Sequence, residues 1–167
     1  MRPLRVRLYL KVALFLLVAP GSVVVYIPGA VLRRSGYTGF PAVSPVSLLS
    51  ILFWVIGAAI LLLCVRDFAV HGEGTPAPVD PPRVLVVRGL YRYTRNPMYG
   101  GILLMLCAEA SFFASSALLV YALIVFLFFH LFVCGYEERA LRRKFGNAYE
   151  RYCRSIPRWG IAFRAYR

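Results

Sequence analysis

Three long stretches of the chain carry almost no charge, and they constrain the fold more than any other feature. Residues 12–32 and 35–65 have no charged side chain, and residues 96–136 have only Glu109. A helix needs about 20 apolar residues to cross a bilayer core about 30 Å thick, and each stretch is long enough. A soluble domain of 167 residues, 60% of them hydrophobic, would leave much apolar surface in water. The sequence therefore predicts an integral membrane protein.

The lengths of these stretches predict an all-α, polytopic bundle of about four transmembrane helices. The first span covers about residues 8–32 and is expected to kink at its Pro-Gly pair, and the second covers about 46–65. As one helix, residues 99–135 would measure about 55 Å, which exceeds the bilayer core. We therefore expect a turn at 114–116 that separates a short third span from a fourth.

The positive charges gather on one side of this predicted bundle. The N-terminus, the loop at 66–98 and the C-terminal tail are rich in Arg, while the opposite side receives Arg33 and Arg34. Lys and Arg are retained on the cytoplasmic side, so both termini are predicted to be cytoplasmic. The preference for Arg over Lys indicates a GC-rich genome, and we expect a bacterial cytoplasmic membrane. The net charge is +13, and the basic residues flank apolar segments. We therefore expect membrane lipids as partners and no nucleic acid.

Two parts of different composition follow one another along the chain. Residues 1–65 are predicted to hold two membrane helices, and residues 66–167 a functional core of loop, helical hairpin and basic amphipathic tail. The loop is rich in Gly and Pro but contains the apolar run 84–87, which favours a folded, functional loop. In the tail, residues 147–156 place aromatic and apolar side chains on one face, so we expect an interfacial helix there.

Polar residues converge on the Arg-rich side of this bundle. The hairpin brings the start of the third span beside the end of the fourth, which places the turn Arg95-Asn96-Pro97 near the pair Glu137-Glu138. Adjacent carboxylates at a membrane interface repel each other, so their presence indicates a cationic partner. Neighbouring arginines are one such partner, and a bound cationic ligand is the alternative.

The order of these residues resembles the isoprenylcysteine carboxyl methyltransferases and the related phospholipid methyltransferases. The isoprenylcysteine enzymes carry Gly-x-Tyr, Arg-His-Pro-x-Tyr-x-Gly, two hydrophobic segments, Glu-Glu, then a Phe-Gly-x-x-Tyr-x-x-Tyr run and Pro. The corresponding residues of this chain, within about 72–160, are Gly89, Tyr91, Arg95, Pro97, Tyr99, Gly101, Glu137, Glu138, Phe145, Gly146, Tyr149, Tyr152 and Pro157. Asn96 stands where those enzymes have His, and Asn-Pro-Met-Tyr instead resembles the phosphatidylethanolamine methyltransferases. The substrate class therefore stays open.

The resemblance implies a membrane methyltransferase with S-adenosylmethionine as cofactor, bound in a pocket at the cytoplasmic helix ends. Carried over by position, the cofactor-binding residues are Gly89, Tyr91, Arg95, Asn96, Pro97, Tyr99, Gly101, Glu137 and Glu138. Of these, Arg95 and Glu138 are expected to have the catalytic roles. Arg95 suits the carboxylate of the cofactor, and a carboxylate suits its ammonium or ribose hydroxyls. No metal site is expected, because no cysteine pair has ligand spacing.

We expect a lipophilic acceptor that enters from the bilayer, as an isoprenylcysteine carboxyl methyltransferase would require. A phospholipid amine and a hydrophobic thiol are alternative acceptors, and a lipid-binding scaffold is the alternative outside the enzymes. A carboxylate acceptor needs no base, whereas an amine must first lose a proton. Glu137, Glu138 or a tyrosine is the candidate base.

Two further features have two interpretations each. The pair Gly100-Gly101 permits close approach of a ligand but equally suits close helix packing in a membrane. Glu109 is expected either to line a substrate cavity or to lie near the headgroups at the hairpin turn. The sequence leaves the oligomeric state open.

Overall fold

The computed structural model describes residues 13–14, 16–37, 39, 41–71 and 84–166. Every regular element in this part of the chain is a helix, so the predicted all-α fold is confirmed. Among the described residues, three helices are long and apolar enough to cross a membrane: Leu16–Arg34, Pro45–Phe68 and Ser116–Phe145. Helix α4, Pro97–Phe112, is apolar but shorter and corresponds to the predicted short third span. The predicted start of the first span, before residue 13, lies outside the described residues.

The chain forms two compact units that interleave along the sequence. Unit 1 comprises residues 1–59 and 101–125, and unit 2 comprises residues 60–100 and 126–167. The predicted site residues from Gly89 to Glu138 fall in unit 2, with the exception of Gly101. The division predicted at residue 65 follows composition alone and stays a prediction.

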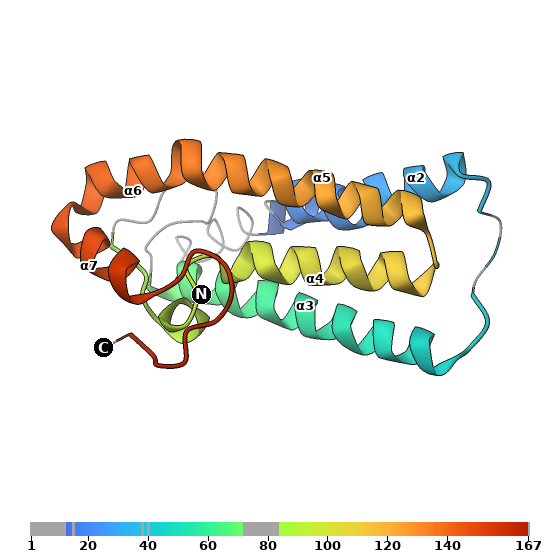
Figure 1. Ribbon diagram of the computed structural model, residues 1–167, viewed down its shortest axis with the longest axis horizontal. Coiled ribbons are helices and arrows are strands. Elements are labelled where there is room, and N and C mark those ends of the chain that lie inside the picture. The colour runs from blue at the N-terminus through green and yellow to red at the C-terminus, as the bar shows by residue number, and fades with distance from the viewer. Residues whose placement is uncertain (1–12, 15, 38, 40, 72–83, 167) are drawn as a thin grey trace, which may run out of the picture. The chain divides into compact units, whose positions relative to one another are not determined.

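In unit 1 the hairpin between α4 and α5, Ser116–Phe132, turns where the sequence predicts it (Figure 1). Ala114 has a φ of 46°, a left-handed conformation that reverses the chain and is tolerated better by a small side chain. The Ser115 hydroxyl accepts a hydrogen bond from the Leu118 N–H at 3.3 Å, which caps the first turn of α5. The small residues at 114–116 therefore make the turn.

The first described span is interrupted by the π-helical turn Ser22–Tyr26, which continues into α2, Ile27–Arg34. The N–H that follows this turn bonds to the carbonyl five residues back. The next carbonyl, that of Val23, would need the N–H of Pro28, which proline does not have. The Tyr121 hydroxyl donates to the Val23 oxygen instead, at 2.9 Å. Tyr121 of α5 thus donates the hydrogen bond to Val23 that Pro28 cannot donate within the first span.

Helices α3, Pro45–His71, and α4 pack closely in unit 1. A Cβ added at Gly57 would lie 2.6 Å from the Gly101 carbonyl oxygen and 2.6 Å from Met105 Cγ. Because backbone of α4 cannot move aside, this separation requires glycine. Gly101 therefore takes part in close helix packing, which is one of the two interpretations of the pair Gly100-Gly101.

Unit 2 ends in two short helices. The π-helical turn Val133–Glu137 leads into α6, Glu138–Phe145, and Gly146 with a φ of 50° redirects the chain into α7, Asn147–Ser155 (Figure 1). Tyr149, Tyr152 and Ile156 lie on one face of α7, as the sequence predicts, and form a buried cluster against which Leu85 and Val87 pack. The apolar run in the long loop is thus part of the core of unit 2.

The C-terminal tail runs beside the segment that precedes α4. Backbone hydrogen bonds join Arg95 N to Pro157 O at 3.0 Å, Ala162 N to Tyr93 O at 2.7 Å, and Tyr166 N to Arg92 O at 2.9 Å. These bonds satisfy backbone groups at the end of the 3₁₀ turn Gly89–Arg92 and in the irregular residues that follow it. The tail thereby fixes the position of Arg95, which is central to the site.

Candidate functional site

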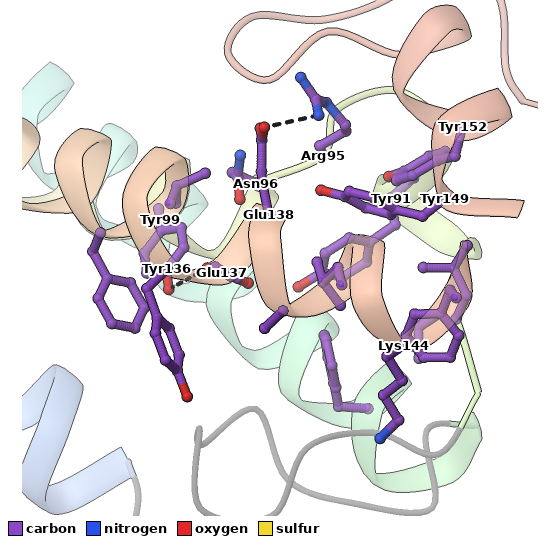
Figure 2. Close-up of a pocket in the computed structure, with 18 residues that line it drawn as sticks. Tyr91, Arg95, Asn96, Tyr99, Tyr136, Glu137, Glu138, Lys144, Tyr149 and Tyr152 are labelled. Atoms are coloured by element: carbon purple, nitrogen blue, oxygen red, sulfur yellow. Dashed lines mark hydrogen bonds and ion pairs between the residues drawn. The ribbon is translucent and has the colours of Figure 1, made fainter. Parts of the chain in front are cut away.

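A cavity of about 200 Å³ lies within unit 2 (Figure 2). Its walls come from the end of α3, the run 85–86, the turn before α4, the start of α4, the π-helical turn, α6 and α7. The predicted site residues that line it are Tyr91, Arg95, Asn96, Tyr99, Glu137 and Glu138. The lining does not include Gly89, Pro97 or Gly101. The structure thus brings the Arg-Asn-Pro turn and the glutamate pair into one cavity.

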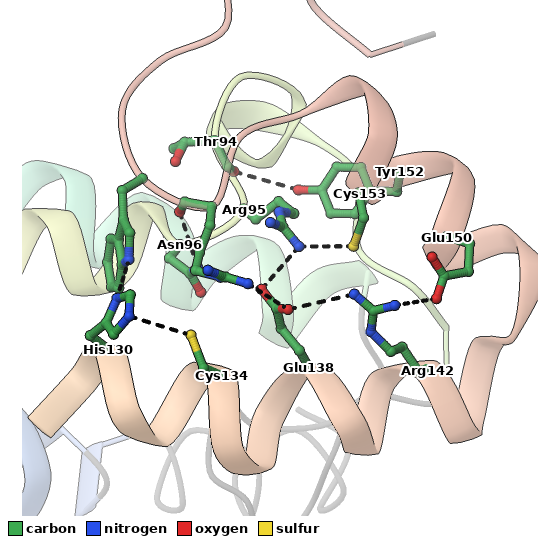
Figure 3. Close-up of polar contacts among 12 residues, drawn as sticks. Thr94, Arg95, Asn96, His130, Cys134, Glu138, Arg142, Glu150, Tyr152 and Cys153 are labelled. Atoms are coloured by element: carbon green, nitrogen blue, oxygen red, sulfur yellow. Dashed lines mark hydrogen bonds and ion pairs between the residues drawn. The ribbon is translucent and has the colours of Figure 1, made fainter.

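Glu138 is 5% exposed and is surrounded by arginines (Figure 3). Its Oε1 accepts a hydrogen bond from Arg158 Nε at 2.6 Å and lies 3.0 Å from Arg95 Nη1. Its Oε2 accepts a hydrogen bond from Arg158 Nη2 at 3.0 Å and lies 3.7 Å from Arg142 Nη2. These hydrogen bonds raise the pKa of the Arg158 guanidinium, which keeps its charge. The cationic partner of Glu138 is therefore a set of three arginines, of which only Arg142 is close in sequence.

Arg95 links this carboxylate to the rest of the site. Besides its ion pair with Glu138, its Nη1 donates a hydrogen bond to Cys153 Sγ at 2.8 Å. Its Nε is buried and has no hydrogen-bond partner among the described residues. A buried donor without a partner costs about 1–3 kcal/mol, which an accepting group of a ligand would recover. Arg95 is thus held in place by protein contacts, and its buried Nε lacks an acceptor among the described residues.

Glu137 has a different environment from its neighbour. Its Oε2 accepts a hydrogen bond from the Tyr99 hydroxyl at 2.9 Å, and no ion pair to it occurs among the described residues. The Tyr99 ring in turn packs on Phe129, with 4.5 Å between the ring centroids. In Figure 2 Glu138 points toward Arg95, whereas Glu137 points toward Tyr99. Glu137 therefore keeps acceptor capacity at the cavity that Glu138 has lost.

Three tyrosines in the cavity wall stay neutral. Burial raises the pKa of the Tyr91 phenol well above its ordinary value, and burial likewise raises the pKa of Tyr149 and Tyr152. The charge of Arg95 opposes this rise in the pKa of Tyr149 and Tyr152 without overcoming it. The Tyr152 hydroxyl donates to the Tyr91 carbonyl at 2.6 Å. These phenols are therefore hydrogen-bond donors at neutral pH and are unsuited to act as bases.

Two residues of the site were not predicted from the sequence: Arg158 and Cys153. The Arg158 carbonyl accepts a hydrogen bond from Asn96 Nδ2 at 3.0 Å, while its side chain binds Glu138. The sequence does indicate that a buried carboxylate needs cations, but the tail holds many arginines and no pattern selects this one. Asn96 thus fixes the backbone from which Arg158 reaches Glu138.

Comparison with known proteins bears on the identity of this site. A family model described as phospholipid methyltransferase matches residues 46–148, more than half of the chain. Comparisons with curated proteins and with solved structures gave no match. The matched segment contains all the predicted cofactor-binding residues, from Gly89 to Glu138. The resemblance found in the sequence is confirmed, and the chain belongs to the phospholipid methyltransferase family of membrane proteins.

Proposed function

We propose that the chain transfers a methyl group from S-adenosylmethionine to a lipophilic acceptor in the cavity of unit 2. Family membership supports a membrane methyltransferase that acts on lipid-type substrates. The observation that carries the proposal for this cavity is the buried Arg95 Nε, which lacks a partner among the described residues. A scaffold would have no need to keep a buried charged donor unpaired.

The polar groups of the cavity suit those of S-adenosylmethionine, although its volume of about 200 Å³ would have to widen to admit the whole cofactor with an acceptor. Arg95 Nε suits the carboxylate of the methionine part, because a charged donor and a charged acceptor form a strong hydrogen bond. Neutral phenols such as Tyr149 and the amide of Asn96 suit uncharged ribose hydroxyls. When bound, the cofactor supplies a methyl group on a positively charged sulfur. Glu138 fixes Arg95 and Arg158, so we propose it as a positioning residue.

The apolar part of the cavity suits the acceptor. Val133, Leu141 and Phe145 line it together with Phe132. Methyl transfer is an in-line displacement, so the protein has mainly to position donor and acceptor and to exclude water. Apolar walls can position a lipid acceptor and exclude water. If the acyl chains of this lipid stay in the bilayer, the cost of about 0.8 kcal/mol for each CH₂ that would enter water is avoided. We therefore keep the prediction of an acceptor that enters from the bilayer.

The geometry favours an amine as acceptor. An amine must lose a proton to become nucleophilic, and Glu137 is the carboxylate with acceptor capacity left. Glu138 is engaged by arginines, and the buried phenols of Tyr149 and Tyr152 are neutral. A phosphatidylethanolamine-type lipid is therefore the acceptor we propose first, with Glu137 as base.

A carboxylate acceptor of the isoprenylcysteine type is the second candidate. Lys144 lines the same cavity and supplies a second cation in addition to Arg95. Two cations suit an anionic acceptor. Such an acceptor needs no base, so Glu137 would be dispensable for the chemical step. The two candidates therefore make opposite predictions for Glu137→Gln: turnover falls with an amine acceptor and stays the same with a carboxylate acceptor.

The test is a substrate screen with methyl-labelled S-adenosylmethionine and detergent-solubilised protein. We expect label in phosphatidylethanolamine, a fall of about 100-fold or more in turnover for Glu137→Gln, and unchanged cofactor affinity. Tyr136→Phe, a change at a more exposed lining residue, is the matched control. Label in a prenylcysteine that Glu137→Gln leaves undiminished would support the carboxylate instead. Thermal stability that does not change at saturating cofactor would contradict the proposal and support a scaffold.

A further inference from the structure

Unit 1 contains a second cavity, of about 400 Å³. Its wall is formed by the π-helical turn Ser22–Tyr26, by α2 and α3, and by α4 with the residue after it. The residues that line it are Val24, Val25, Pro28, Gly29, Leu32, Ser50, Ile51, Trp54, Ala108, Glu109, Phe112 and Phe113. All but three of these side chains are hydrocarbon or glycine. The volume lies within the roughly 300–1,000 Å³ of typical small-ligand sites. The cavity is therefore large enough for part of a ligand and suits an apolar one.

One carboxylate interrupts this apolar wall. Glu109 Oε1 accepts a hydrogen bond from Trp54 Nε1 at 2.9 Å, whereas Glu109 Oε2 is buried without a hydrogen-bond partner among the described residues. The lining contains no Lys, Arg or His, and no ion pair to Glu109 occurs in the described part of the chain. A carboxylate in an apolar membrane segment is costly unless a cation or a donor compensates it. The protein supplies one donor, and the described residues supply none for the second oxygen.

We propose that this cavity binds an aminophospholipid of the bilayer, with its primary ammonium on Glu109 Oε2 and an acyl chain along the apolar wall. An ammonium would keep this carboxylate ionised, and its N–H would supply the hydrogen bond that Oε2 lacks among the described residues. The quaternary ammonium of phosphatidylcholine has no such N–H. A lipid without an ammonium, such as phosphatidylglycerol, has no cation for Glu109. This site is separate from the cavity proposed for methyl transfer and does not depend on it.

Trp54 offers a direct probe of this site, because it lines the cavity and the chain has only one other tryptophan. In a Trp159→Phe background, its fluorescence in phosphatidylcholine nanodiscs reports quenching by lipids with brominated acyl chains. We expect brominated phosphatidylethanolamine to quench at a lower mole fraction than brominated phosphatidylglycerol, with an apparent affinity higher by about tenfold or more. Equal quenching by the two lipids would overturn the proposal.

Two variants separate headgroup recognition from chain binding. Glu109→Gln keeps the acceptor for Trp54 but removes the charge, so the preference for phosphatidylethanolamine should disappear. Gly29→Leu should fill part of the cavity and reduce quenching by both lipids, since a Cβ there has only Arg33 Nη1 at 4.0 Å nearby. Because this change also replaces a helical glycine, it is not expected to unfold the protein. A preference that survives Glu109→Gln, or quenching that Gly29→Leu leaves unchanged, would overturn the proposal.

Cofactor binding gives an independent readout. Neither variant changes a residue of the cavity in unit 2, so thermal stabilisation by S-adenosylmethionine should match the parent in both. Loss of lipid preference with retained cofactor binding supports the second site. If the parent itself shows no cofactor binding, the proposed function fails while the quenching experiment still decides the lipid site.

Discussion

In unit 2, Glu138 has contacts with Arg95, Arg158 and Arg142, whereas in unit 1 Glu109 has one hydrogen bond, from Trp54 Nε1. Both carboxylates have oxygens removed from water, so both need compensation. In unit 2 three arginines compensate the Glu138 carboxylate, and this carboxylate in turn holds the arginines in place. In unit 1 the protein supplies part of this compensation. The difference indicates that a buried charge with complete protein contacts positions its neighbours, while an incompletely compensated one marks a place for a ligand.

Glu138→Gln should have the largest effect, because it leaves three guanidiniums around an uncharged amide. We expect the free energy of unfolding to fall by about 2–3 kcal/mol. This is below the roughly 3–5 kcal/mol of a fully buried pair, because the Arg142 and Arg158 side chains are 45% and 33% exposed. Equilibrium unfolding in detergent measures the change.

The matched control for this prediction is Glu150→Gln. Glu150 pairs with the same Arg142, but its side chain is 40% exposed, so its loss should cost less than about 1 kcal/mol. Equal losses for the two variants would mean that the arginine cluster around Glu138 behaves like an ordinary surface pair, and the contrast between the units would disappear.

Arg95→Lys should distinguish the structural role of Arg95, its ion pair with Glu138, from its proposed role in binding S-adenosylmethionine. Lysine keeps the positive charge near Glu138 but has no Nε donor and no planar fork. We expect affinity for S-adenosylmethionine to fall by about 10- to 100-fold, as for the loss of a hydrogen bond to a charged group. Calorimetry measures the affinity, and Arg142→Lys, whose arginine is more exposed, should bind like the parent. Parent-like binding by Arg95→Lys would remove Arg95 Nε from the cofactor site.

Several elements of both units could be predicted from the sequence because they have local causes. The turn at 114–116, the end of α6 at Gly146 and the buried face of α7 follow from residue size, glycine and helical spacing. The meeting of Arg95 with Glu138 followed from the hairpin, which the length of 99–135 required. The orientation of the termini stays a prediction.

The partners of the glutamates could not be predicted. Glu137 and Glu138 are consecutive and chemically identical, yet one binds Tyr99 and the other Arg158. Successive helical side chains point about 100° apart, and the π-helical turn that ends at Glu137 shifts the direction in which each one points. Such a turn has no clear sequence pattern. Arg158 was missed because its selection depends on the path of the tail, which long-range backbone bonds at Arg95 determine.

Gly57→Ala tests the packing of unit 1. The new Cβ would lie 2.6 Å from the Gly101 carbonyl oxygen, so α3 and α4 would have to separate. We expect a loss of about 1–3 kcal/mol in the free energy of unfolding, typical of an overpacked site. Cofactor affinity should not change, because no residue of the cavity in unit 2 is altered. A Gly57→Ala variant as stable as the parent would show that close backbone packing contributes little to unit 1.

Gly100→Ala is the smallest change and examines the residue next to Gly101. Gly100 is exposed, lies inside α4, and has no atom within 4 Å of a Cβ added there. Alanine restricts the unfolded chain more than glycine does, so the free energy of unfolding should rise by up to about 0.5–1 kcal/mol. We expect cofactor affinity to stay the same, since Gly100 does not line the cavity. A weaker affinity for S-adenosylmethionine would instead mean that the ligand approaches the backbone at Gly100, which would extend the site to the first turn of α4 and restore the ligand-binding interpretation of the glycine pair.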